Sequence, residues 1–107
     1  MIIIKNKEEY NDIINNNDNV LIYCGLINCP PCKIVSPHFE DLDNKLKLEN
    51  KNIVLCKIIA DDFEEIKTIL NLKKFPVFTL IKDKNILTQI NTSKIVDVVQ
   101  LLCYLDI

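Results

Sequence analysis

Apolar positions follow two different patterns along the chain. Continuous apolar runs, such as Val20 to Cys24 and Ile53 to Ala60, are typical of strands that are buried on both faces. Between them, from Val35 to Leu46, apolar residues recur at intervals of four and three, which indicates a long amphipathic helix. The chain therefore alternates between strand-like and helix-like segments.

The remaining segments extend this alternation to both ends of the chain. Residues able to cap a helix precede three further helical patterns, and short apolar runs separate them. The predicted helix starts are Asn6 with Glu9, Asp61 with Glu64, and Thr92 or Ser93. The predicted strands are Ile2 to Lys5, Val20 to Cys24, Ile53 to Ala60, Pro76 to Ile81 and Ile86 to Ile90.

The order of these elements predicts the topology. Strand–helix–strand units require parallel pairing with right-handed crossovers. The tip from Asp83 to Asn85 is short enough to join the last two strands as an antiparallel hairpin. We therefore expect residues 1–107 to form a single α/β domain in the order β-α-β-α-β-α-β-β-α. Its mixed five-stranded sheet is flanked by four helices.

Composition excludes several classes of function. The chain has 107 residues, 15 acidic and 13 basic, with a net charge of −2, so it lacks the basic surface that nucleic-acid binding requires. All the basic residues are lysines, which removes bidentate arginine contacts to phosphate or base. Gly25 is the single glycine, so a glycine-rich phosphate loop is excluded by count. No nucleic-acid partner is expected.

The same sequence predicts a location in the cell. No apolar stretch reaches the length of a membrane span, so no membrane partner is expected. The start from Met1 to Lys5 is too short and too soon charged for a signal peptide, which indicates a cytoplasmic protein. The bias toward Ile, Asn and Lys suggests an A/T-rich genome, such as that of a parasite or large DNA virus. For a virus, the location would be the host cytoplasm or the virion.

The Cys-Pro-Pro-Cys segment from Cys29 to Cys32 carries the candidate chemistry. It lies where a buried strand leads into a helix, and a helix N-terminus stabilises a thiolate. Such placement lowers a cysteine pKa from about 8.5 toward roughly 3.5–7.5, and Lys33 adds a positive charge. We expect the more exposed Cys29 to attack a disulfide and Cys32 to resolve the mixed disulfide. The two prolines leave the Cys32 N–H as the main backbone donor to the Cys29 sulfur.

Two metal-binding alternatives remain open at this point. A zinc site needs four ligands, and outside the pair only single cysteines and His38 are present. The spacing Cys24-x4-Cys29-x2-Cys32 matches one type of iron–sulfur site, with Cys56 or Cys103 as fourth ligand. Because the segment reads as strand followed by helix, we favour redox chemistry and expect no metal.

The three other cysteines can be explained mainly as buried or packing residues. Cys24 reads as a small buried residue, or as a third redox thiol that could capture Cys29. Cys56 reads as strand core, and Cys103 as helix packing or partly exposed. We expect His38, the single histidine, to be a solvated helix residue.

These residues together resemble the thioredoxin family. The matching features are the Cys29–Cys32 segment followed by Lys33, the helix-bending Pro37, and Phe75-Pro76 before a strand. The resemblance implies a thioredoxin fold and a thiol–disulfide oxidoreductase that needs no cofactor beyond its dithiol. It also implies a cis peptide bond before Pro76, with an ordinary trans proline as the alternative.

The resemblance further implies a groove that binds substrate, with three departures. The groove would be lined by Asn28, Pro30, Phe75 and Pro76. Asn28 replaces the usual Trp, Pro30 a frequent Gly, and Tyr23 a buried Asp that assists proton transfer in the family. Without that Asp, Lys57 is expected to be solvated or to bond the Tyr23 hydroxyl. We therefore hypothesise a slower enzyme with narrower substrates.

The expected partners follow from the resemblance. They are proteins carrying disulfides or thiols, together with an external reductant such as a thioredoxin reductase or glutathione. We expect a monomer. The alternative function is a thioredoxin-fold binding module that holds a partner in the same groove with little turnover.

Overall fold

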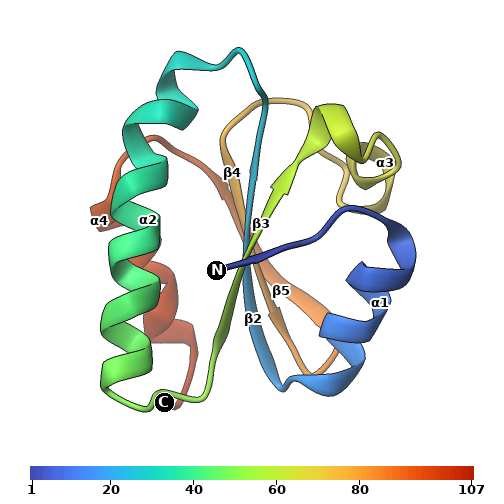
Figure 1. The fold of residues 1–107 in the computed structure, drawn as a ribbon. Coiled ribbons are helices and arrows are strands. Elements are labelled where there is room, and N and C mark those ends of the chain that lie inside the picture. Colours follow the sequence, from blue (N-terminus) through green and yellow to red (C-terminus); the bar gives the residue numbers. More distant parts are fainter.

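A five-stranded mixed sheet forms the centre of the molecule in the computed structural model, which describes residues 1–107 (Figure 1). The strands lie in the order β1-β3-β2-β4-β5. β1 and β2 pair with β3 in parallel, whereas β2–β4 and β4–β5 are antiparallel. The strands are β1 Ile2–Ile3, β2 Asn19–Gly25, β3 Val54–Ile59, β4 Val77–Lys82 and β5 Asn85–Asn91.

Helices cover both faces of this sheet. α2 and α4 lie on one face and α1 and α3 on the other (Figure 1). The helices are α1 Lys7–Asn16, α2 Pro30–Leu48, α3 Ile66–Ile69 and α4 Ile95–Leu101, with short 3₁₀ turns η1 Ala60–Asp62 and η2 Leu102–Tyr104. The predicted mixed sheet, its four helices and their order are confirmed. None of these helices combines the length and apolar character needed to cross a membrane.

The alternation of side chains in β2 divides the core into two clusters. Leu21 and Tyr23 face α2 and α4, whereas Val20, Ile22 and Cys24 face α1 and α3. All five are essentially buried because β2 is the central strand and both faces are covered. The continuous apolar run therefore results from two separate cores that share one strand.

Three local predictions are wrong. The segment from β3 through α3 to β4 does not form a parallel strand–helix–strand unit. After the single turn of α3, β4 runs antiparallel to β2. Asp61 and Glu64 cap no helix: α3 has no side-chain cap, and Asp61 lies in η1. Helix α4 likewise begins without a side-chain cap, because the Thr92 hydroxyl donates to Asp97 and accepts only from the N–H of Lys94.

The predicted hairpin between β4 and β5 is confirmed, with a shorter tip than expected. Asp83 and Lys84 alone form the turn, with φ of 50° and 72°, and Asn85 already belongs to β5. Two successive residues with positive φ suit the twist of a two-residue antiparallel turn.

Candidate active site

The cysteine pair occupies the first turn of α2. Cys29 is the N-cap residue, Pro30 and Pro31 fill the first helical positions, and the Cys32 N–H donates to the Cys29 sulfur at 3.3 Å. The predicted backbone donor is thus confirmed. A disulfide joins the two residues, whose Cα atoms are 5.2 Å apart. Cys29 is 7% exposed and Cys32 2%, so an incoming sulfur has better access to Cys29.

A groove of about 430 Å³ lies beside this turn and contains the predicted Phe75 and Pro76. The peptide bond between them is cis, as the family resemblance implied. The Asn91 side-chain amide donates to the Pro76 carbonyl at 2.6 Å, so the end of β5 fixes this loop. Sequence reasoning missed Asn91 because no local motif connects residues fifteen positions apart. The full lining is Pro31, Phe75, Pro76, Asn91, Thr92, Ser93, Lys94 and Asp97.

The predicted Asn28 and Pro30 lie outside this groove, on an exposed surface that also carries apolar side chains. Ile27 and Ile34 are 56% and 61% exposed, and they flank the cysteine pair along the chain. Their position next to the motif was visible in the sequence, but their exposure to solvent depends on the tertiary structure. They supply exposed apolar area close to the cysteine pair along the chain.

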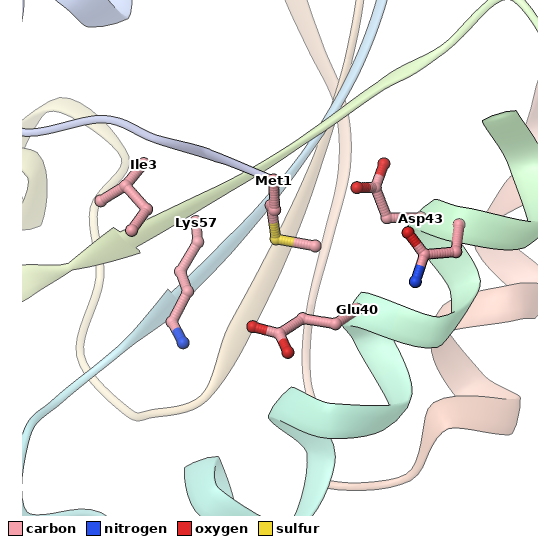
Figure 2. Close-up of a pocket in the computed structure, with 6 residues that line it drawn as sticks. Met1, Ile3, Glu40, Asp43 and Lys57 are labelled. Atoms are coloured by element: carbon pink, nitrogen blue, oxygen red, sulfur yellow. The ribbon is translucent and has the colours of Figure 1, made fainter.

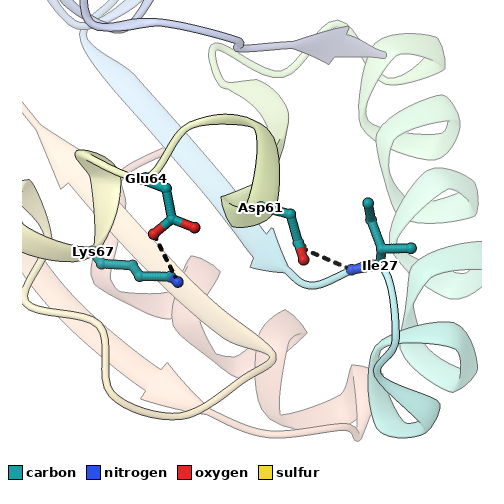
Figure 3. Close-up of polar contacts among 4 residues, drawn as sticks. All are labelled: Ile27, Asp61, Glu64 and Lys67. Carbon is teal, nitrogen blue, oxygen red and sulfur yellow. Dashed lines mark hydrogen bonds and ion pairs between the residues drawn. The ribbon is translucent and has the colours of Figure 1, made fainter.

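The loop that precedes Cys29 is tied to η1 by a side chain. The Asp61 carboxylate accepts a hydrogen bond from the Ile27 N–H at 2.9 Å, as Figure 3 shows. Glu64, also drawn there, pairs with Lys67 at 2.9 Å within its own segment. Asp61 therefore positions the approach to the active site instead of starting a helix.

Tyr23 lies in the α2-facing core beneath the cysteine pair. Its ring centroid is 5.8 Å from that of Phe39 and 5.4 Å from that of Phe78, so the three rings form one aromatic cluster. Burial, with a smaller contribution from Cys24, raises the pKa of Tyr23 to about 12. The phenol is therefore protonated at neutral pH and cannot act there as a base.

Gly25 is required by the same tyrosine. A Cβ at this position would lie 2.7 Å from the Tyr23 Cζ atom and nearer still to its hydroxyl oxygen. Real Cβ atoms essentially never approach other atoms so closely. The single glycine of the chain thus accommodates a side chain two residues away.

Lys57 does not bond the Tyr23 hydroxyl, nor is it simply solvated. Its amine donates to the Ser36 hydroxyl at 3.1 Å and lies 5.7 Å from the centre of the Tyr23 ring. The two strands are paired at this point, with Tyr23 opposite Lys57, so both side chains face α2. Lys33 is exposed and forms no ion pair.

The remaining cysteines are separated from the pair. Cys24 and Cys56 belong to the cluster facing α1 and α3, on the opposite side of the sheet, and Cys103 is exposed in η2. Burial raises the pKa of both Cys24 and Cys56 to about 12, which makes them poor nucleophiles. The iron–sulfur alternative requires the Cys24 sulfur to lie close to the cysteine pair, but Cys24 faces the opposite side of the sheet. No three His, Cys, Asp or Glu side chains group in a metal-binding arrangement.

Comparison with known proteins agrees with this geometry. The thioredoxin family model matches residues 1–102. A thioredoxin from Coprinus comatus is 30% identical over 81 residues, which cover 76% of this chain and 74% of that protein. A probable protein disulfide-isomerase A4 from Caenorhabditis elegans is 26% identical over 82 residues, but these cover only 13% of its length.

Solved structures share the same fold. A Plasmodium falciparum thioredoxin superposes with a TM-score of 0.89 at 21% identity, covering 97% of this chain and 98% of that one. The oxidised mitochondrial thioredoxin 3 of Saccharomyces cerevisiae gives 0.88 at 22% identity, with 98% and 95% covered. With the family match and the Cys29–Cys32 disulfide, the function is thiol–disulfide exchange. The chain belongs to the thioredoxin family.

Proposed function

We propose that Cys29 is the nucleophile and Cys32 the resolving thiol in the reduction of protein disulfides. The Cys29 thiolate attacks one sulfur of a substrate disulfide, which breaks that bond, forms a mixed disulfide and releases one substrate thiolate. The Cys32 thiolate then attacks the Cys29 sulfur and releases the second substrate thiolate. Two electrons pass to the substrate, and the Cys29–Cys32 disulfide is formed.

The position of the Cys29 sulfur carries this proposal. It caps α2 and accepts the Cys32 N–H at 3.3 Å, in a first turn that contains no acidic residue. A helix N-terminus stabilises negative charge, so the thiolate is favoured there over a thiol within a strand. The greater exposure of Cys29 supports its role as the attacking residue.

The groove supports a preference among substrates. We infer that Phe75 and Pro76 align an extended substrate segment, while Asn28 and Pro30 contact it from the exposed surface. The groove is otherwise polar, with Thr92, Ser93, Lys94 and Asp97 in its lining. A mixed surface of this kind favours a narrower set of partners than a flat apolar one.

The surrounding residues have supporting roles in this proposal. Lys33 adds positive charge near the first turn of α2, Tyr23 fills the core below it, and Lys57 supplies a cation behind Cys32. Because the phenol of Tyr23 cannot accept a proton at neutral pH, we propose that turnover is slower than in a family member with a carboxylate there.

The wider setting of the enzyme is proposed from the same observations. The dithiol carries the electrons, so no further cofactor is needed, and a thioredoxin reductase or glutathione would restore it. We propose that residues 1–107 act as one domain and as a monomer in the cytoplasm. Both core clusters share β2, which supports a single folding unit.

The proposed roles are tested by trapping. Cys32→Ser should accumulate a mixed disulfide with substrate protein through Cys29, whereas Cys29→Ser should accumulate none. Insulin-disulfide reduction should be measurable but slower than that of a thioredoxin with the carboxylate. A protein that captures its partner equally well when both cysteines are serine would instead be a binding module.

A further inference from the structure

A small pocket lies behind the resolving cysteine. It has a volume of about 170 Å³ and is formed where α2 faces the ends of β2 and β3. Its titratable side chains are Tyr23, Cys32, Lys33 and Lys57, joined by the hydroxyl of Ser36. No carboxylate lines it: the Asp61 carboxylate accepts from the Ile27 N–H. The charges that line this pocket are therefore cationic.

Lys57 also lines a second, acidic pocket. This pocket has a volume of about 340 Å³, and Glu40 on α2 and Lys57 on β3 extend into it (Figure 2). Asp43 lies in the same lining but already pairs with Lys47 at 2.9 Å. Glu40 forms no ion pair, so it is the carboxylate free to attract Lys57. The other lining residues are Met1, Ile3 and Asn44.

Spacing along α2 places these groups in one row. Cys32, Ser36 and Glu40 are four residues apart, so they lie one turn after another on the same helix face. Lys57 projects from β3 toward the middle of this row, where its amine donates to Ser36 at 3.1 Å. Ser36 thus holds the ammonium at the middle of a helix row that has Cys32 one turn before it and Glu40 one turn after it.

The resolving step needs a charge in this place. Cys32 is only 2% exposed, and a buried thiolate is unfavourable unless a cation or hydrogen bonds stabilise it. Tyr23 is a neutral phenol at working pH and cannot remove the proton. Lys57 is the half-buried cation that lines the same pocket as Cys32, whereas Lys33 is exposed to solvent.

We propose that Ser36 anchors the Lys57 ammonium where it stabilises the Cys32 thiolate during the second step of exchange, and that Glu40 competes for the same ammonium. The thiol proton leaves to bulk water, and Lys57 keeps its charge throughout. Lys57 and Ser36 are thus positioning residues that act through Cys32. This inference rests on the proposed role of Cys32 as the resolving thiol.

The experiment follows the second step alone. The enzyme is reduced, mixed rapidly with a disulfide substrate, and the decay of the mixed disulfide is recorded between pH 5 and 9. Lys57→Met should slow this decay about tenfold at neutral pH and raise the midpoint of its pH profile by about one unit. Ser36→Ala should slow the decay about threefold and raise the midpoint of the pH profile by less than Lys57→Met does. Lys57→Arg should restore most of the rate.

Glu40→Gln provides a matched test, in which the rate of the second step should change in the opposite direction. Removing the competing carboxylate should speed the second step about twofold and lower its pH midpoint. Glu40 is exposed, so this variant should fold even if a change at Lys57 disturbs the sheet. Formation of the mixed disulfide by Cys29 should be unchanged in Glu40→Gln, because Glu40 lines neither the groove nor the pocket behind Cys32.

Two results would overturn the inference. One is an unmoved pH midpoint in Lys57→Met, and the other is a slower second step in Glu40→Gln. Both leave the proposed function intact if Cys32→Ser still traps substrate. Failure of that trap, by contrast, removes the assigned role of Cys32 itself.

Discussion

Two pairs of cysteines differ in what the backbone around them provides. Cys29 and Cys32 sit in the first turn of α2 and form a disulfide, whereas Cys24 and Cys56 lie inside neighbouring strands on the opposite face of the sheet. All four side chains are largely buried. Burial therefore does not distinguish the reactive pair from the inert one.

The difference lies in the groups that face each sulfur. The Cys29 sulfur accepts a backbone N–H at the positive end of a helix. The strand thiols lie in the apolar core without a helix start beside them, and burial, as the largest cause, raises the pKa of each to about 12. In this fold, the start of α2 creates the nucleophile, and the sheet interior makes a thiol behave as a hydrophobic side chain.

The largest expected effect comes from removing one cysteine of each pair in turn. Cys29→Ser should abolish insulin-disulfide reduction, since the hydroxyl cannot form the mixed disulfide. Cys24→Ala should leave the rate within about twofold while lowering the free energy of unfolding by about 1 kcal/mol. The rates and urea denaturation curves are measured side by side. A large loss of activity in folded Cys24→Ala would show that the strand thiol takes part.

The glycine next to Cys24 tests how tightly the end of β2 is packed. Gly25→Ala would place a Cβ 2.7 Å from the Tyr23 Cζ atom, so the ring must shift. We expect a loss of about 1–3 kcal/mol in the free energy of unfolding, as for other overpacked cores. The double variant Tyr23→Leu with Gly25→Ala should lose less free energy of unfolding than the sum of the two single losses, because the smaller side chain leaves room for the new Cβ. Strictly additive losses would contradict the proposed contact.

High pH should destabilise the fold through the strand thiols. Their pKa is about 12 in the folded chain against an ordinary 9.0, so between these values the folded state binds more protons than the unfolded state. The free energy of unfolding is unaffected by this effect below pH 9.0 and falls as the pH rises toward about 12. Tyr23 adds to the fall from pH 10.0 upward.

Urea denaturation at several pH values checks this sign. Replacing both Cys24 and Cys56 by Ala should make the alkaline loss shallower, while Cys103→Ala, at an exposed site, is the matched control. If the free energy of unfolding of the double variant fell equally steeply at alkaline pH, groups other than these two thiols would cause the loss.

The smallest effect is expected at the loop before the reactive pair. Asp61→Ala removes the acceptor for the Ile27 N–H and should cost about 1 kcal/mol of unfolding free energy, with a few-fold drop in turnover. Asp61→Asn keeps an acceptor oxygen and should lie closer to the unmodified protein. Thermal melts and insulin assays of the two variants measure the difference. Equal behaviour of Ala and Asn would rule out the hydrogen bond as the cause.

The sequence predicted those features that depend on short spacings. The helix start at the Cys29–Cys32 segment, the donor N–H of Cys32 and the buried runs all follow from neighbouring residues. The cis bond before Pro76 came from family resemblance, and it is present. The expected α/β arrangement is likewise confirmed.

Features that depend on distant residues were not predicted. Asp61 reads locally as a helix cap, but in the fold it reaches a loop 34 residues away in sequence. Asn91 fixes the Pro76 carbonyl, and Lys57 bonds Ser36, only because the sheet and α2 bring them together. Side-chain contacts of this kind are settled by tertiary packing, for which a single sequence holds no local signal.

Titration of the reduced protein with iodoacetamide, with modification located by mass spectrometry, tests the central claim most directly. The helix start should make Cys29 react with a midpoint below about pH 7.5. Cys24 and Cys56 should remain unmodified at that pH in the folded protein, because burial raises the pKa of each to about 12. Alkylation of Cys29 only above about pH 9, alongside the strand thiols, would contradict the account.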